Sequence, residues 1–447
     1  MTELLKFLDL SPYPGDLTPA DHACLEHLSL VDPRSFRVGI GEDNEHEDWL
    51  PIVERGRDGR WWAGRYIGSL TFEGRRIVIE PRLGIAQVES WLDTAFGLIA
   101  PPVSARRVES EDFLVRLLAR VWCRGIDGAS RHGLPLLRLS RPHEGLFVRG
   151  RLDVRRTTAL MGEGRGTIAS STTDRSLNHP VSRAIVCADH ALATHLTGTA
   201  EWRTERVRQA MPHMRAAVGS RPKLPTLHEL DRVHYTPITL PFKRAALLSH
   251  RIASRLGYGA SSEVGQDEGL LVDVAELWEL FVLNCVRQAS PSGSRVEHGT
   301  RAGRPDFFLR SIDGGMEMGR LKPDVIVSAG DTVTAVIDAK YKRFIDTRER
   351  PTGVDPADLY QIVAYSMRFK PTASSALVYP CAPGSESHAI AYGERFGPWE
   401  CEGRTIMFRG VPTDPRGCRE AIAGGILGTR TDPPTPAPAA ATTTSRV

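Results

Sequence analysis

The sequence predicts a multidomain protein of the α+β or α/β class, with a β-rich N-terminal region, a helical middle and a C-terminal mixed sheet flanked by helices. The chain has 447 residues, more than one hydrophobic core normally holds. Its 41% hydrophobic and 25% charged residues are typical of a soluble globular protein. Strand-like apolar patterns occur near the N-terminus, helical periods dominate the middle, and both alternate after residue 272.

The first 83 residues are predicted to be β-rich. Residues 65–72 and 76–80 are apolar, strand-like runs on either side of Glu73-Gly74, which predicts a hairpin. Trp61 and Trp62 lead into it.

The middle of the chain is predicted to be mainly helical. The predicted helices are residues 85–99, 109–122, 179–196, 202–218 and 242–256. Gly125 is expected to stop the second helix, and Pro212 to kink the fourth. Residues 147–154 alternate like a strand, and the Gly, Ser and Thr residues of 162–173 indicate a loop.

We predict three regions from this order. Residues 1–230 form an N-terminal region, residues 231–428 form a second domain, and residues 429–447, rich in Pro, Ala and Thr, form a disordered tail. No run of about 18 apolar residues and no signal-peptide pattern occurs, so we expect the protein in the cytoplasm.

Two apolar runs in the C-terminal third predict a β-hairpin. They cover residues 325–327 and 333–337, with a glycine in the turn between them. If residues 330–332 form a three-residue loop, Ala329 pairs with Val333.

This register places Asp324 opposite Asp338. Like charges facing each other across a ladder repel, and a divalent cation such as Mg²⁺ or Mn²⁺ removes the conflict. Lys340 shares a strand face with Asp338 and can orient a metal-bound water or steady a phosphate. The sequence can therefore assemble a metal-dependent phosphodiesterase site, the alternative being a solvated ion pair.

Lysine usage supports a chemical role for Lys340. The chain has 7 lysines and 50 arginines, and Lys322, Lys340 and Lys342 surround the two aspartates. Lysine changes its pKa readily, whereas arginine stays charged. Asp306, which follows Pro305, is a competing candidate for the first ligand, but a strand and a loop separate it from the next apolar run.

These residues resemble a known family. Residues 324 and 338–340 resemble the PD-(D/E)XK nuclease pattern. More narrowly, IDAKYK at 337–342 and LYQIVAY at 359–365 resemble the nuclease subunit of modified-cytosine-dependent restriction systems, the McrC-type family. The weaker similarities upstream are LWELFV at 277–282, residues 174–178, GRYIG at 64–68 and IVIEPR at 77–82.

The resemblance implies that the C-terminal mixed sheet is a PD-(D/E)XK nuclease core. It implies Asp324 and Asp338 as metal ligands and Lys340 as the cation that positions water. Glu279 is the candidate for an acidic ligand from the first core helix, and a solvated helix carboxylate is the alternative.

The helix at 358–369 is the other predicted source of site residues. Gln361 and Tyr365 lie one turn apart on it, and either can face the site.

The resemblance also implies partners. The McrC-type family works with a separate ring-forming AAA-type GTPase that recognises methylated DNA, and its nuclease subunit inserts an N-terminal extension into that ring. We therefore expect DNA and a GTPase ring as partners, with residues 1–230 contacting the ring. This chain has no Gly-x-x-x-x-Gly-Lys-Ser/Thr loop, so we expect no nucleotide bound to it. A non-catalytic adaptor that stimulates a ring NTPase and a stand-alone nuclease are the alternatives.

Nucleic-acid affinity would have to come from local patches, because the formal net charge is only +3. Residues 101–160 hold 12 arginines and 6 acidic residues. Phosphate binding, an acidic partner and plain solvation are all compatible with this pattern.

Overall fold

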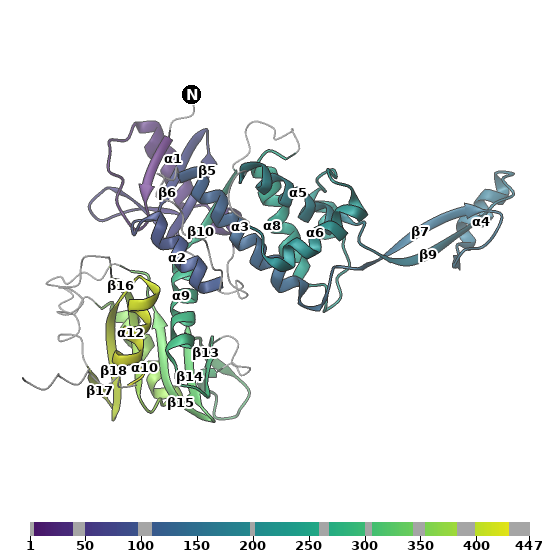
Figure 1. The fold of residues 1–447 in the computed structure, drawn as a ribbon. Coiled ribbons are helices and arrows are strands. Elements are labelled where there is room, and N and C mark those ends of the chain that lie inside the picture. Colours follow the sequence, from purple (N-terminus) through teal and green to yellow (C-terminus); the bar gives the residue numbers. More distant parts are fainter. Residues whose placement is uncertain are drawn as a thin grey trace, which may run out of the picture.

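The structure, a computed structural model, describes residues 4–38, 50–96, 110–196, 202–258, 268–299, 306–342, 354–381 and 398–428. It has several sheets and helical layers (Figure 1), which confirms the predicted mixed α+β multidomain fold. The predicted tail at 429–447 lies outside these residues. Within the described ranges, no helix combines the length and apolar character needed to cross a bilayer.

Five strands form the N-terminal sheet, in the order β1-β6-β5-β10-β2. Their bounds are Leu4–Leu8 (β1), Arg37–Val38 (β2), Tyr66–Phe72 (β5), Arg75–Glu80 (β6) and Glu268–Asp273 (β10). The antiparallel pair β5–β6 is the predicted hairpin. β10 comes from much later in the sequence and pairs antiparallel with β5.

The predicted β-rich region also contains a helix. α1 (Pro19–Ser29) begins at a capping box formed by Thr18 and Asp21. A short ladder of β3 (Val53–Arg55) and β4 (Trp61–Ala63) lies beside it. Together these elements bury a small core of their own against β1, β5 and β6.

The five predicted helices of the middle region are confirmed, and the structure has a further short helix there, α7. It consists of α2 (Ile85–Phe96), α3 (Ser110–Ala129), α5 (Pro180–His195), α6 (Glu205–Val218), α7 (Leu227–Asp231) and α8 (Pro241–Arg255). The expected stop at Gly125 is wrong, because α3 continues to Ala129. A glycine inside a helix costs only about 1 kcal/mol, and burial of Trp122 and Ile126 on either side outweighs it.

A long β-arm projects from the helical body (Figure 1). It consists of β7 (Leu137–Gly145), β9 (Ile168–Ser176), the short β8 (Arg151–Leu152) and α4 (Val154–Gly162). The predicted strand at 147–154 is therefore largely wrong, and so is the predicted loop at 162–173, much of which is β9. No β9 residue beyond Ser170 is buried, so the alternation that marks a half-buried strand is absent.

The structure divides the arginine-rich segment 101–160 into two parts. On α3, Arg116 pairs with Glu89 at 2.8 Å and Arg120 pairs with Asp93, so these arginines hold α2 against α3. On the arm, the arginines are exposed. They are Arg138, Arg141, Arg149, Arg151, Arg155 and Arg156.

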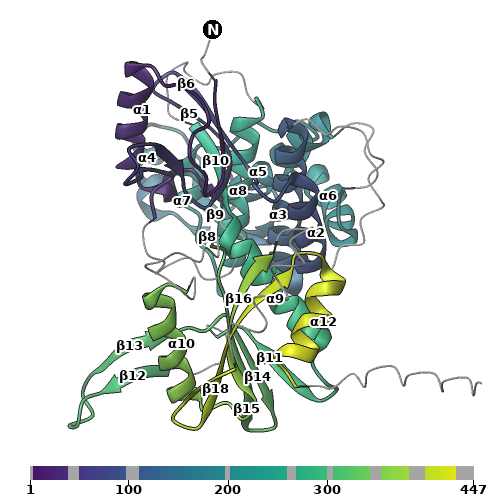
Figure 2. The same cartoon turned by 90° about the vertical axis from the view of Figure 1, so that its left-hand side faces the viewer.

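The second sheet has the strand order β11-β14-β15-β16-β18-β17. Its strands are Ser294–Glu297 (β11), Val325–Ala329 (β14), Thr332–Ala339 (β15), Ser374–Cys381 (β16), Trp399–Cys401 (β17) and Arg404–Pro412 (β18). α9 (Val274–Ala289) and α12 (Pro415–Gly425) pack on one face, and α10 (Pro356–Phe369) packs on the other. A hairpin of β12 (Asp306–Arg310) and β13 (Glu317–Leu321) projects beside α10 (Figure 2).

The turn between β14 and β15 is one residue shorter than predicted. Ala329 pairs with Thr332, so the loop has two residues rather than three. A bulge after Val327 then shifts the register by one, and Val325 faces Ile337. The Thr334 hydroxyl donates to the Val327 carbonyl oxygen at 3.1 Å, beside the bulge. The predicted alignment of residues 324 and 338 therefore holds despite the wrong turn.

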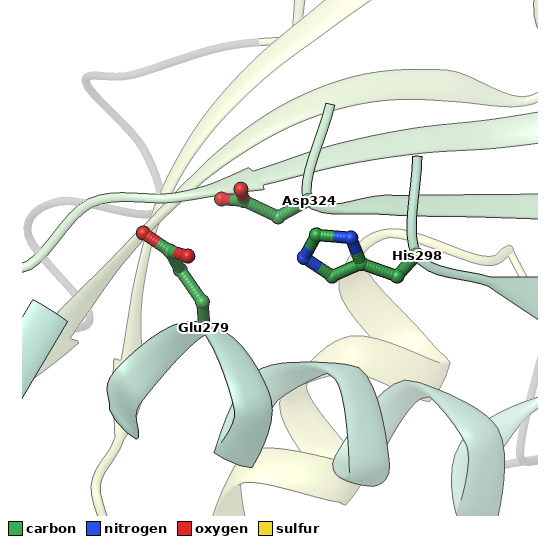
Figure 3. A group of neighbouring side chains, drawn as sticks. All are labelled: Glu279, His298 and Asp324. Carbon is green, nitrogen blue, oxygen red and sulfur yellow. The ribbon is translucent and has the colours of Figure 1, made fainter. Parts of the chain in front are cut away.

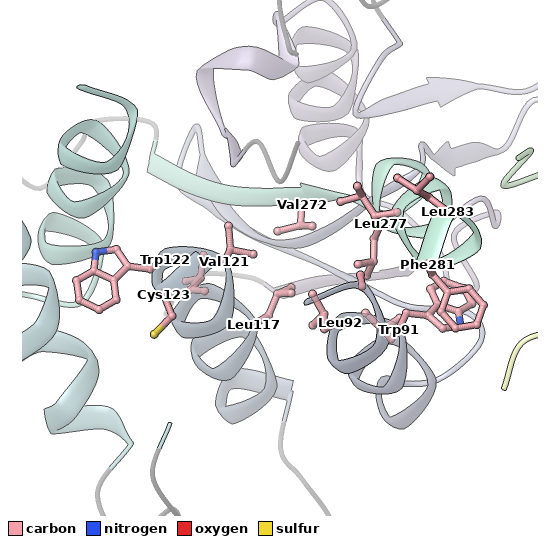
Figure 4. Packing of buried hydrophobic residues seen from close by; sticks show 14 of the residues in the cluster. Trp91, Leu92, Leu117, Val121, Trp122, Cys123, Val272, Leu277, Phe281 and Leu283 are labelled. Atoms are coloured by element: carbon pink, nitrogen blue, oxygen red, sulfur yellow. The ribbon is translucent and has the colours of Figure 1, made fainter. Parts of the chain in front are cut away.

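α9 joins the two halves of the molecule. It follows β10 directly, and its Leu277 and Phe281 belong to the same core as Trp91 and Leu92 of α2 and Val272 of β10 (Figure 4). The predicted domain boundary at residue 230 stays a prediction, and the elements just after it, α8 and β10, pack with α5 and β5.

Gly68 lies where the backbone of β10 passes close to β5. Its φ is +144°, and a Cβ there would lie 2.1 Å from the Leu270 carbonyl oxygen. Any side chain would have to push these strands apart.

We therefore expect Gly68→Ala to destabilise the protein. Backbone strain alone costs about 1–3 kcal/mol, and the clash of the new Cβ with the Leu270 carbonyl oxygen adds to it. Gly125→Ala is the matched control: it has open space around it inside α3, and we expect it to stabilise by about 0.5–1 kcal/mol. Thermal unfolding of the two variants tests this, and a Gly68→Ala protein as stable as wild type would contradict it.

Candidate active site

Asp324 lies at the end of the second sheet where β14 begins. Extending the Val325–Ile337 pair by one residue puts it opposite Asp338. Its Oδ2 accepts a hydrogen bond from the Ala339 N–H at 2.6 Å. Asp324 is therefore held against the strand that carries Asp338 and Lys340.

Asp338, Lys340 and Gln361 form a connected polar chain on the α10 face. The Asp338 side chain is almost fully buried, and its Oδ2 lies 2.6 Å from Lys340 Nζ. Lys340 Nζ also donates to Gln361 Oε1 at 2.8 Å, and Gln361 Nε2 donates to the Tyr365 hydroxyl at 2.9 Å. The neighbouring Lys342 pairs with Asp358 of α10 at 2.9 Å.

Burial and neighbouring charges shift the pKa values of Asp338 and Lys340 in opposite directions. Burial raises the pKa of the Asp338 carboxyl, and the ammonium of Lys340 opposes that rise. Burial alone would lower the pKa of Lys340, but the carboxylates of Asp338 and Asp324 outweigh it and raise that pKa. Burial, followed by the same two carboxylates, raises the pKa of Tyr365. The sheet end is thus a site of concentrated negative potential.

A second group of side chains gathers around Asp324 (Figure 3). Glu279 reaches it from α9, and His298 reaches it from the residue after β11. One ligand atom from each of the three lies within 4.8 Å of the others. The chain comes close here because Gly299 lies against Pro323, whose carbonyl oxygen accepts the Gly299 N–H at 3.1 Å.

This donor set fits a divalent ion. Carboxylates are ordinary ligands for Mg²⁺ and Mn²⁺, and an imidazole is an ordinary ligand for transition-metal ions; metal–oxygen distances of about 2.1 Å require only small side-chain movements from the present spacing. The structure thus brings Glu279 and Asp324 together as the sequence predicted. Asp338 is not in this group of described residues, and its carboxylate is paired with Lys340.

The sequence interpretation missed His298 and Asp358. His298 follows a short edge strand, and only the pairing of β11 with β14 brings it beside residue 324. Asp358 sits in the first turn of α10, where acidic residues are common for reasons unrelated to a site. The competing candidate Asp306 begins β12, which pairs only with β13 among the described strands and not with the main sheet.

Comparison with known proteins decides the family. A family model described as a McrBC 5-methylcytosine restriction system component matches residues 62–380. The chain belongs to this family. The McrBC match covers all the candidate site residues and confirms the family resemblance seen in the sequence.

Solved structures and curated proteins add the following. The chain is similar to one in a refined half-complex from a tetradecameric assembly of Thermococcus gammatolerans McrB AAA+ hexamers with bound McrC. The two chains are 16% identical with a TM-score of 0.47, and the match covers 94% of this chain and 99% of that one. A chain of the Thermococcus gammatolerans McrBC complex matches at 16% identity and a TM-score of 0.35, covering 64% and 88%. No curated protein matches the chain.

If Glu279, His298 and Asp324 hold a metal ion, removing the imidazole should weaken its binding. We expect His298→Ala to lower Mn²⁺ affinity by at least about tenfold, since even indirect partners of metal ligands have effects of that size. Isothermal titration of the full-length chain measures it. His213→Ala, at an exposed position on α6, is the control and should bind as wild type does. Equal affinity for the His298 variant would remove His298 from the ligand set.

Proposed function

We propose that this McrBC-family chain is the metal-dependent DNA endonuclease subunit of a two-component restriction system. In this proposal it cuts DNA after recruitment by an AAA-type GTPase that recognises modified cytosine. The observation that carries it is the convergence, at one sheet end, of a carboxylate–imidazole group around Asp324 with the Asp338–Lys340–Gln361 chain.

Each part of this site has a distinct task in phosphodiester hydrolysis. Glu279, His298 and Asp324 would hold Mg²⁺ or Mn²⁺, with Asp338 beside them as the predicted further ligand. The ion, when bound, supplies a more acidic water and offsets charge on the departing oxygen. An ion pair with Asp338 and a hydrogen bond to Gln361 fix the direction of the Lys340 side chain. An ammonium has three N–H donors, so one that Gln361 does not accept can donate to a phosphate oxygen or to the attacking water.

The β-arm is the part of the N-terminal region best suited to contact a ring-shaped partner. It extends from the helical body (Figure 1), and its far end exposes 71% of Leu146 and 78% of Phe147. Exposed apolar side chains rimmed by polar ones are typical of protein interaction sites, and the exposed Arg149 and Arg151 follow these two residues closely in the sequence. We infer that the AAA-type GTPase partner binds this arm, at a distance from the cutting site.

Asp338→Asn tests the chemistry. It keeps the side-chain shape but removes the charge that holds Lys340, so we expect cleavage by the chain with its ring partner, GTP and Mg²⁺ to fall by at least about 100-fold. Assembly with the partner should be unchanged. Asp331→Asn, in the exposed turn at the other end of β15, is the control and should cut normally. Undiminished cutting by Asp338→Asn would favour the adaptor alternative.

Shortening the arm tests the partner surface. Leu139 pairs with Asp174, so residues 140–173 can be replaced by a two-residue Gly-Gly turn without moving the helices at its base. We expect this variant to bind Mn²⁺ like wild type but to lose co-elution with the GTPase and stimulation of GTP hydrolysis. Full stimulation by the shortened chain would place the partner surface elsewhere.

A further inference from the structure

Tyr341 connects the candidate active site to the N-terminal sheet. It stands directly between Lys340 and Lys342, just after β15, and is 3% exposed. Lys340 points to the α10 face, where Gln361 accepts its hydrogen bond. Tyr341 instead belongs to the core on the opposite side, together with residues of α2 and α9.

Two side chains from the N-terminal part of the chain, Arg82 and Trp91, contact Tyr341. The guanidinium carbon of Arg82 lies 4.8 Å from the ring centroid, a cation–π arrangement, and Arg82 Nε lies 3.5 Å from the hydroxyl oxygen. Trp91 of α2 meets the ring edge-on at 6.0 Å. Arg82 is itself held by Asp9, fully buried just after β1, through its backbone N–H and through an ion pair at 3.7 Å.

The other element of the site is fastened to the same sheet. The Asp273 carboxylate caps α9 by accepting the Ala275 N–H at 2.9 Å, and Arg65 binds it at 3.0 Å. Arg37 pairs with Glu276 one turn into the helix at 3.1 Å. The helix that carries Glu279 and the strand end that carries Lys340 therefore both rest on the N-terminal sheet. Arg65 and Arg82 belong to the two N-terminal motifs, GRYIG and IVIEPR, to which the proposed chemistry assigns no role.

We propose that Arg82, held by Asp9, is a positioning residue for the nuclease: by fixing Tyr341 it fixes Lys340, the next residue in the chain. This inference rests on the proposed nuclease function. The backbone here is held from two sides, since the Lys340 N–H donates to the Val378 carbonyl oxygen at 2.8 Å while the Tyr341 ring is clamped by Arg82. Without the clamp the strand end can shift, and a displacement of about 1 Å can cost about 100-fold in rate.

The first test is cleavage by the full-length chain with its ring partner, DNA, GTP and Mg²⁺. We expect Arg82→Ala to lower kcat by about 10- to 100-fold while KM for DNA stays within about twofold, because only the placement of Lys340 changes. Arg82→Lys keeps a cation over the ring and should recover most of the rate. The matched control is Arg75→Ala: Arg75 lies on β6 and pairs with the buried Asp21 at 2.6 Å. It should lose comparable stability but keep its kcat.

The second test does not depend on activity. Hydrogen exchange of the backbone amides at 338–342 should accelerate in Arg82→Ala and stay at the wild-type rate in Arg75→Ala. Unchanged kcat and unchanged exchange in Arg82→Ala would overturn the positioning role and leave the nuclease proposal standing. A wild-type protein that never cuts DNA, with exchange still faster in Arg82→Ala, would instead overturn the nuclease proposal and support the hold of Arg82 on residue 341.

Discussion

The burial of α9 is the constraint on which the rest of the structure depends. The helix begins at Val274, directly after its N-cap Asp273, which ends strand β10 of the N-terminal sheet, and 11 of its 16 residues are buried. Asp273 and Glu276 are themselves buried but bind arginines, and removing one member of such a buried pair typically costs about 3–5 kcal/mol. α9 therefore cannot rotate or slide without disturbing both sheets, and this rigidity gives Glu279 a defined position beside Asp324.

Much of the candidate site could be predicted because its key residues are close in the sequence. Asp324, Asp338 and Lys340 lie on one hairpin, where side-chain alternation and register are local properties. The turn length was wrong, yet the alignment held, because the bulge after Val327 restored the residue that the shorter turn removed. Sequence patterns report the apolar faces that must be buried, and those faces fixed the alignment more strongly than the turn did.

The remaining features depend on contacts between distant segments, which leave little local signal. His298 reaches the site only because β11 pairs with β14, and β10 joins a sheet whose other strands lie near the N-terminus. The strands of the arm lack a buried face along much of their length, so β9 does not show the alternation that reveals most strands. Gly125 failed as a stop signal because tertiary burial on both sides of it outweighed helix propensity.

The β-arm has a consequence for how such proteins diversify. Its strands pair mainly with each other and end far from the sheet that holds Lys340 (Figure 1). Insertions, deletions and charge changes at its tip leave the packing around α9 untouched. Under the proposed functions, partner recognition at the arm and hydrolysis at the sheet end would occupy separate parts of one polypeptide, so the tip could change in sequence without altering the candidate site.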